Sequence, residues 1–349
     1  MKKLITLTIC AVLVVAAYLS WTMIQFLNKP ANQETAEVIF EIPSGTPFYL
    51  ISEKLYREGL IADKTRFNFF AKISKQTTQL KVGEYLLRRN MTPYEVLKIL
   101  TEGKSIVHNL TIPEGHNIFN IRDLFNERWP GRGDEFFKIV NDKKIVNELI
   151  KTDVPESLEG YLFPETYTFT KFTPMITLVR QMVHNFNSNI QEIRSNAKIK
   201  MPLHEHVILA SVIEKETGAP EERPLISSVF HNRLEKKMKL QSDPTILYGM
   251  FLQTGQVTKS IRRSDILNPT PYNTYTVKAL PIGPIANPGK EALFAAVNPA
   301  NSKYLYFVSR NDGTHVFSES YKDHNRAVKD FQLNRKAREG KSWRDRKNK

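Results

Sequence analysis

The sequence predicts a mixed α+β protein with an N-terminal transmembrane helix, a small α/β module and a larger mixed α/β domain. Three observations lead to this fold class. The chain opens with an apolar stretch, strand-like runs and helical patterns alternate after it, and 349 residues exceed the usual size of one domain. We expect these segments: a cytoplasmic N-terminus 1–3, a transmembrane anchor 4–27, a linker 28–37, the module 38–105, the larger domain 106–333 and a basic tail 334–349.

The apolar stretch Leu4–Leu27 has 24 consecutive residues without a charge and follows Lys2 and Lys3. At about 1.5 Å per residue it is long enough to cross the hydrocarbon core of a bilayer. A cleavable signal peptide is the rival, but its apolar region is normally shorter and ends in an Ala-x-Ala-like site, whereas the run after Ala16 continues through Trp21. We therefore expect an uncleaved anchor, with the two lysines in the cytoplasm and the remaining chain outside it.

The formal net charge of +14 is unevenly distributed. The segment Arg335–Lys349 carries a net +6 and the two N-terminal lysines add two, which leaves +6 for all other residues. We expect the basic tail 334–349 to be disordered. No helix-turn-helix, zinc-finger or RNA-binding signature is present, so nucleic acid is not an expected partner. Cys10 is the only cysteine, which excludes an intramolecular disulfide.

A strand, a turn and a helix recur at an interval of about seventy residues. Val38–Ile42 is β-branched and aromatic, and Pro43-Ser44-Gly45 follows it as a turn signal before a helical pattern. The run Ile112-Pro113-Glu114-Gly115 repeats this arrangement. Thr92 with Glu95 is a capping box that starts another helix. The segment 38–105 resembles, through this coarse pattern, the LysM-like module of cell-wall proteins.

The segment Glu205–Thr217 reads as a helix stopped by Gly218. On a helical wheel, Leu209 and Ile213 lie within about 60° of Glu216, in the middle of an apolar stripe, while Glu214 lies roughly 160° away on a more polar side. A carboxyl on a core-facing stripe loses hydration, which raises its pKa towards values useful for a general acid. The alternative is that the end of the helix lifts Glu216 into solvent or into an ordinary ion pair with an arginine such as Arg223 or Arg233.

Polar and aromatic loops surround this helix in the sequence. Sugars bind to flat apolar rings and to amides or carboxylates, and these loops supply both. Ordinary turn chemistry of Asn and Asp explains the same composition equally well. The candidate substrate-binding residues are Tyr161, Glu165, Gln241, Asp243, Tyr272, Asn273 and Tyr275.

No metal or cofactor is expected. His204-Glu205-His206 is superficially similar to a zinc helix, but Ile208 occupies the fifth position of His-Glu-x-x-His, so the motif fails. The sequence contains neither a Gly-rich phosphate loop nor a Gly-x-Ser-x-Gly nucleophile elbow.

Several motifs in one order resemble the endolytic murein transglycosylase family, also called YceG-like. The resemblance extends over roughly residues 38–333 and includes the N-terminal anchor. It departs from the family at Ile282, where we expect proline. The motifs are Glu214-Lys215-Glu216-Thr217, Val229-Phe230-His231-Asn232-Arg233-Leu234, Leu240-Gln241-Ser242-Asp243-Pro244-Thr245, Tyr248-Gly249, Pro271-Tyr272-Asn273-Thr274-Tyr275 and Tyr304-Leu305-Tyr306-Phe307-Val308.

The resemblance implies that Glu216 is the catalytic residue, because the second glutamate of Glu-Lys-Glu-Thr has that role in the family. The implied enzyme is a lytic transglycosylase of the bacterial plasma membrane with its catalytic part in the periplasm. It cleaves the β-1,4 bond between N-acetylmuramic acid and N-acetylglucosamine inside glycan strands and leaves a 1,6-anhydro end. The implied partners are peptidoglycan glycan strands and peptidoglycan synthases.

Two other functions fit the same residues. One is a non-catalytic scaffold that holds peptidoglycan through the LysM-like module, with Glu216 merely structural. The other is a muramidase that hydrolyses the same bond, with Glu165 or Asp243 as the second carboxylate that most glycosidases need.

Overall fold

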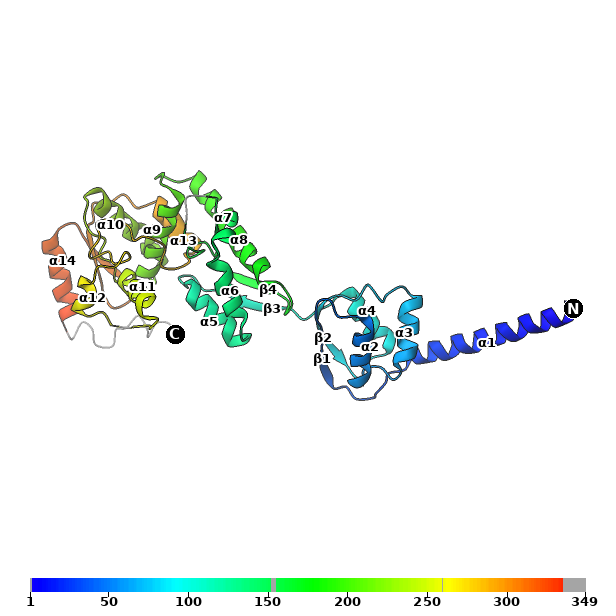
Figure 1. The fold of residues 1–349 in the computed structure, drawn as a ribbon. Helices are drawn as coiled ribbons and strands as arrows, with labels where there is room; N and C mark the ends of the chain where they lie inside the picture. The colour runs from blue at the N-terminus through cyan, green and yellow to red at the C-terminus, as the bar shows by residue number, and fades with distance from the viewer. Residues whose placement is uncertain (1, 152–154, 259, 335–349) are drawn as a thin grey trace. The chain divides into compact units, whose positions relative to one another are not determined.

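The computed structural model describes residues 2–151, 155–258 and 260–334. The predicted basic tail 334–349, apart from Asn334, lies outside the described residues. The protein consists of helices and small sheets, so the predicted α+β class is confirmed (Figure 1). It divides into two compact units, one of Met1–Leu110 with Thr168–Pro174 and the other of Thr111–Tyr167 with Met175–Lys349.

The first unit contains the long N-terminal helix and one two-stranded antiparallel sheet, in which Phe40 lies opposite Tyr85. The capping box predicted at Thr92 and Glu95 is present at the start of α4. The elements are α1 (Lys2–Asn28), β1 (Glu37–Ile42), α2 (Phe48–Arg57), α3 (Lys64–Ile73), β2 (Gly83–Arg88), α4 (Pro93–Glu102) and β3 (His108–Thr111).

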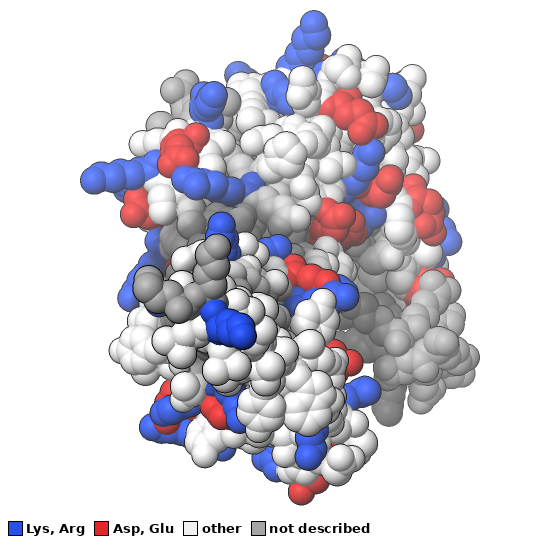
Figure 2. Space-filling model, turned by 90° about the vertical axis from the view of Figure 1, so that its right-hand side faces the viewer, with Lys and Arg blue, Asp and Glu red and all other residues white. Residues whose placement is uncertain are grey.

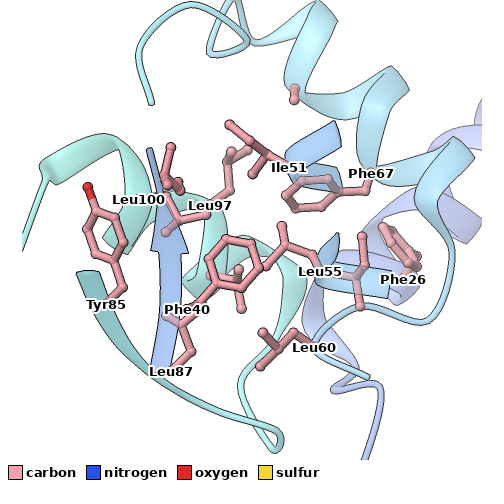
Figure 3. Close-up of a cluster of buried hydrophobic side chains, with 14 residues drawn as sticks. Phe26, Phe40, Ile51, Leu55, Leu60, Phe67, Tyr85, Leu87, Leu97 and Leu100 are labelled. Carbon is pink, nitrogen blue, oxygen red and sulfur yellow. The ribbon is translucent and has the colours of Figure 1, made fainter. Parts of the chain in front are cut away.

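A single apolar core holds the first unit together (Figure 3). Phe40 and Leu55 are fully buried in it, and the side chain of Phe26, from the last turn of α1, belongs to the same cluster. Met23 and Leu27 pack against this core as well. The end of α1 is therefore part of the folded unit.

The described part of the chain has one helix that is long and apolar enough to cross a membrane, Lys3–Asn28. Its apolar side chains, among them Leu4, Leu13 and Leu19, are exposed over most of its length. An exposed apolar helix of this length has the properties of a membrane span.

Strands β3 and β4 form a two-stranded sheet, and each of them has residues in both units. The second unit is mainly helical and carries the antiparallel pair β5–β6. Its elements are α5 (Ile118–Arg128), α6 (Arg132–Val140), α7 (Lys143–Leu149), β4 (Thr166–Phe169), α8 (Met175–Ser195), α9 (Leu203–Glu216), η1 (Pro220–Glu222), α10 (Arg223–Glu235), α11 (Asp243–Thr254), α12 (Arg263–Leu267), α13 (Lys290–Val297), β5 (Tyr306–Ser309), β6 (His315–Ser318), α14 (Tyr321–Val328) and the π-helical turn η2 (Lys329–Leu333).

Helix α9 is the central helix of the second unit and packs against α10, α11 and α13. All eight residues from His206 to Ile213 are buried. The prediction that α9 has a more polar side is therefore wrong, because neighbouring helices pack over that side as well. Even Glu214, predicted on that polar side, has a side chain that is only 6% exposed.

The repeated strand–turn–helix unit predicted from the sequence is confirmed. Gly45 and Gly115 both adopt a left-handed conformation, with φ of 77° and 73°. In each turn the residue after the glycine donates its N–H to the proline carbonyl, over 3.3 Å, and a helix follows. Glycine adopts this φ without the steric cost that a Cβ imposes, which explains why it recurs at both turns.

On the face that Figure 2 shows, basic and acidic side chains are interspersed. Many of the exposed cations are paired with a carboxylate of the same unit, as in Arg88 with Glu37 and Arg180 with Glu148.

Candidate active site

Glu216 is the last residue of α9, and its side chain is neither fully buried nor fully exposed. Its Oε1 accepts a short hydrogen bond from the hydroxyl of Ser242. Among the described residues, no lysine, arginine or histidine forms an ion pair with it. Glu216 thus keeps a carboxyl that is bonded to one hydroxyl, not neutralised by a cation.

Ser242 is itself fixed by a network of buried hydroxyls. Its N–H donates to Thr274 Oγ1 over 2.9 Å, and its carbonyl accepts the hydroxyl of Thr245 over 2.6 Å. It occupies the N-cap position of α11, but its side chain accepts no N–H of that helix, and its hydroxyl donates to Glu216. A serine that forgoes the capping bond usually found at this position is one sign of a functional arrangement.

The residue before Ser242 adopts an unusual backbone conformation. Gln241 has φ of 53°, in the left-handed region that residues other than glycine seldom adopt. Its N–H donates to the carbonyl of Thr274, and its side-chain Oε1 accepts from Arg233. Such strained residues cluster at functional sites, where the surrounding structure holds them in place.

The pKa of Glu216 is raised to about 7. Burial is the main cause, because it penalises the charged carboxylate, and the nearby negative charge of Asp243 adds to it. The hydrogen bond from Ser242 and the positive charge of Arg233 act in the opposite direction. A carboxyl with a pKa near neutrality is available both to give and to take a proton.

Asp243 and Tyr275 form the exposed part of the site. The Tyr275 hydroxyl donates to Asp243 Oδ1 over 2.7 Å, and Asp243 itself is exposed at the first position of α11. Both residues interact electrostatically with Glu216. An aromatic ring and a carboxylate beside a protonated acid are groups suited to a polyhydroxylated ligand.

Glu214, two residues before Glu216, has a different environment. Its Oε1 pairs with Arg223 over 3.0 Å and its Oε2 accepts the N–H of Gly289 over 3.0 Å. Arg223 also pairs with Glu114 over 3.4 Å. Burial raises the pKa of Glu214, but the Arg223 charge and the Gly289 bond oppose this, so Glu214 holds loops against the end of α9.

Arg233 supports the loop that carries Ser242. Its guanidinium is 7% exposed and donates to the carbonyls of Leu305 and Leu240 over 2.6 Å and 2.8 Å. It also lies 5.3 Å from the centre of the Tyr306 ring. Neither Arg233 nor Arg223 pairs with Glu216, so the ion pair considered as an alternative is not formed.

The other predicted substrate-binding residues lie in three environments. Tyr161 is fully buried and its hydroxyl bonds His204 Nδ1 over 2.8 Å. Asn273 is 1% exposed and its amide donates to three carbonyls of residues 265–268. Tyr272 is half-buried against Tyr248, and burial raises its pKa to about 12. Glu165 is exposed and accepts from Asn185 over 2.7 Å.

The structure therefore brings Gln241, Asp243 and Tyr275 together around Glu216. Tyr161 and Asn273 lie in the interior, where they hold neighbouring segments. In the part of the chain that the structure describes, no contact joins Glu165 to Glu216. Equally within that part, no cluster of three or more histidine, cysteine or acidic side chains is arranged to hold a metal.

Glu159 is a buried carboxyl that the sequence analysis did not select. It is 3% exposed and accepts from the N–H of Ile118, the hydroxyl of Tyr248 and the amide of Asn287 over 3.0–3.2 Å. Burial raises its pKa to about 8. Glu159 thus connects α5, α11 and the loop at Asn287. Helix α11 has Ser242, the residue that bonds Glu216, at its N-cap. In the sequence, Glu159 is the only acid in the apolar run Leu158–Phe163, and this pattern could have identified it as a buried carboxyl.

The fold and this site define an α+β protein with a half-buried, protonatable carboxyl at the last residue of a central helix. The chain belongs to the YceG-like family, whose model matches residues 40–330. A curated relative from Bacillus subtilis, named endolytic murein transglycosylase, is 30% identical over 87% of this chain and 88% of its own length.

Two further similarities extend the comparison. A Streptococcus pneumoniae protein with the same name is 30% identical over 82% of this chain, but the match spans only 57% of that longer protein. A crystal structure of a YceG-like protein from Listeria monocytogenes is 33% identical, with a TM-score of 0.57, and the match covers 84% of this chain and 99% of that one.

Proposed function

We propose that this protein is an endolytic peptidoglycan lytic transglycosylase and that Glu216 is its catalytic residue. The observation that carries the proposal is the Glu216 carboxyl, whose pKa is raised to about 7 and which Ser242 orients without neutralising it. The names of the relatives supply the reaction class.

The proposed reaction uses one carboxyl twice. Protonated Glu216 gives its proton to the glycosidic oxygen of the β-1,4 bond between N-acetylmuramic acid and N-acetylglucosamine. The resulting carboxylate then takes the proton of the muramic acid C6 hydroxyl, whose oxygen bonds C1 and forms the 1,6-anhydro end. Water is not consumed, and Glu216 ends the cycle protonated, as it began.

The surroundings of Glu216 fit this scheme. A two-carboxylate hydrolase needs a second carboxylate free to act as nucleophile or to activate water. Glu165 accepts a hydrogen bond from Asn185, and Asp243 accepts one from Tyr275. We propose that Asp243, Tyr275 and Gln241 bind and orient the sugar. Asp243 is the one residue whose position beside Glu216 also favours the hydrolase alternative.

The test of the activity is mass spectrometry of purified glycan strands after digestion. We expect products with 1,6-anhydro ends and intermediate chain lengths, since cleavage inside strands is proposed. Reducing ends would identify a muramidase instead. Intact strands, with a folded protein, would leave the non-catalytic scaffold as the function.

We further propose the layout that the sequence predicts. Residues 4–27 form a single-pass anchor in the plasma membrane with residues 1–3 in the cytoplasm, residues 28–37 are the linker, 38–105 the LysM-like module and 106–333 the periplasmic catalytic domain. The exposed apolar surface of α1 and the strand–helix–helix–strand order of β1, α2, α3 and β2 support it. Synthases that extend the same strands are the proposed protein partners.

Topology has a direct test. A reporter enzyme that works only outside the cytoplasm should be active when it is fused after Leu333, and the purified protein should retain its N-terminus through Leu27. A mature protein that begins between Ala17 and Asn28 would show a cleaved signal peptide and remove the anchor from the proposal.

The pH dependence of cleavage should follow the protonation of Glu216. The general acid must start protonated, so kcat/KM should be level below pH 7 and fall about tenfold per pH unit above it. Ser242→Ala removes a bond that favours the carboxylate, so the descending limb should move to higher pH. Asp243→Asn removes a repelling charge, so the limb should move to lower pH. If the pH at which kcat/KM begins to fall were unchanged in both variants, the assignment of Glu216 as the titrating acid would be contradicted.

A further inference from the structure

A groove of about 450 Å³ lies where helix α1 ends and meets the start of α3. Trp21 and Phe26 line it from α1, Lys29 follows the end of that helix, and Asp63 and Arg66 line it from α3. All of these residues belong to the first unit. The groove is separate from the Glu216 site, which lies in the second unit.

If α1 crosses a membrane, the groove lies at a fixed depth relative to that membrane. This placement rests on the transmembrane anchor proposed above. About 20 residues of helix cross the hydrocarbon core, and tryptophan prefers its boundary. Counted from Leu4, this span ends near Met23, which places Trp21 at the boundary. Lys29 follows Trp21 after eight residues, roughly 12 Å along the helix direction. The headgroup layer occupies about 5–8 Å on each side of the core, so the groove spans it.

Packing fixes this placement. Phe26 is 8% exposed and lies in the apolar core of the first unit, in the same cluster as Phe67 of α3 and Leu60 (Figure 3). Met23 and Leu27 pack against the same core. The walls of the groove on α1 and on α3 therefore belong to one packed body, and the groove cannot move away from the lipid surface independently of the anchor.

The charged side chains that line the groove, those of Lys29, Asp63 and Arg66, sum to one net positive charge. Asp63 caps α3, and its Oδ1 accepts the N–H groups of Thr65 and Arg66 over 2.8 Å and 3.0 Å. Its Oδ2 lies 3.5 Å from the Arg66 guanidinium. Lys29 takes part in none of the ion pairs among the described residues. Asp63 offsets one of the two cations, and the remaining charge matches an anionic phosphodiester.

The exposed side of α3 extends this surface. Arg66, Phe69 and Ile73 lie three and four residues apart and therefore on one face of the helix. Phe69 is 56% exposed and Ile73 is 64% exposed. A face that combines a cation with exposed large apolar side chains is typical of helices that lie in the membrane interface.

From this placement, charge and apolar face, we propose that the groove binds the headgroup phosphate of an anionic phospholipid, with Lys29 and Arg66 as its ligands. Phe69 and Ile73 enter the interface beside it. A lipid bound there would hold the first unit against the membrane and so set the orientation of the chain that follows it.

Native mass spectrometry of the full-length protein tests the proposal. The protein is released from detergent in the presence of equal amounts of phosphatidylglycerol and phosphatidylcholine, and the retained lipids are counted. The wild type should retain phosphatidylglycerol over phosphatidylcholine by about fivefold, in line with the attraction of one net positive charge near a lipid surface. The variant Lys29→Gln with Arg66→Gln should lose this preference.

The matched control is Lys98→Gln with Lys104→Gln, which removes the same charge at the end of α4, outside the groove. It should retain the wild-type preference. Equal losses in both variants would mean bulk charge attraction, and an unchanged preference in the groove variant would exclude the site. Complete displacement of phosphatidylglycerol by millimolar inorganic phosphate would identify a free-anion site and overturn the lipid assignment.

Failure of the lipid site is distinguishable from failure of the proposed function. The same spectra give the intact mass, which reports whether the anchor is present. Glycan cleavage is measured separately on the same preparation. A retained anchor with active cleavage and no lipid preference would overturn the lipid proposal alone.

Discussion

Replacement of Glu216 by Gln should abolish glycan cleavage while the protein stays folded. The amide preserves the shape of the side chain and can still accept the Ser242 hydroxyl, but it has no transferable proton. Loss of a general acid costs about 10²–10⁴-fold in rate, and the loss here should lie at the upper end because the same group also serves as the base. The measurement is release of soluble products from purified glycan strands.

Glu214→Gln is the matched control, two residues away on the same helix. Arg223 retains Glu114 as a partner, so the variant should cleave strands within about tenfold of the wild type, with lower stability because a buried ion pair is broken. Cleavage by Glu216→Gln at a near wild-type rate would refute the assignment. Equal loss in both folded variants would mean that the two glutamates act together.

The stability of the Glu216→Gln variant should also differ from that of the wild type in a pH-dependent way. The folded-state pKa of about 7 exceeds the ordinary value of 4.5, so the folded wild type holds the proton longer than the unfolded chain. The contribution of Glu216 to wild-type stability should therefore fall as pH rises from 4.5 to 7, by about 3 kcal/mol. Glu159 and Glu214 also have raised pKa values and remain in the variant, so the variant should show a smaller fall than the wild type, which thermal unfolding at pH 5 and pH 8 would reveal.

The sequence pattern selected Glu216 on a premise that the structure only half supports. Burial near the end of α9 was expected, and burial is the main cause of the raised pKa. The contrast with Glu214 was expected from a polar side of the helix, which does not exist. What distinguishes the two acids is their partners, since Arg223 neutralises Glu214 while Ser242 only donates a hydrogen bond to Glu216.

Local patterns predicted the elements whose causes are local. The capping box at Thr92 and the two Pro-x-Gly turns depend on residues a few positions apart, so the sequence alone displays them. The bond between Glu216 and Ser242 joins residues 26 positions apart, and that between Asn287 and Glu159 joins residues 128 positions apart. Contacts of this kind depend on packing of the whole unit, which helical periodicity does not report.

Cleavage in water enriched in heavy oxygen should leave no label in the newly formed ends. In the proposed reaction the oxygen that bonds C1 comes from the C6 hydroxyl of the muramic acid, so solvent oxygen never enters the product. A hydrolase must place one solvent oxygen at C1 of every product end. Mass spectrometry of the products distinguishes the two outcomes by two mass units per end, and a known muramidase on the same strands supplies the positive control.

Strands whose muramic acid C6 hydroxyl is methylated should resist cleavage while they still bind, because the Glu216 carboxylate then has no proton to remove and C1 has no internal nucleophile. If Asp243 instead positions a water molecule, methylated strands would still be cut and the heavy oxygen would appear at C1. Asp243→Asn separates these cases further. In a transglycosylase it should retain unlabelled anhydro ends, with weaker strand binding and a pH limb moved to lower pH, because Asp243 both orients the sugar and acts on Glu216 through its charge. Label in most product ends of the wild type would overturn the internal nucleophile even if Glu216 remained the acid.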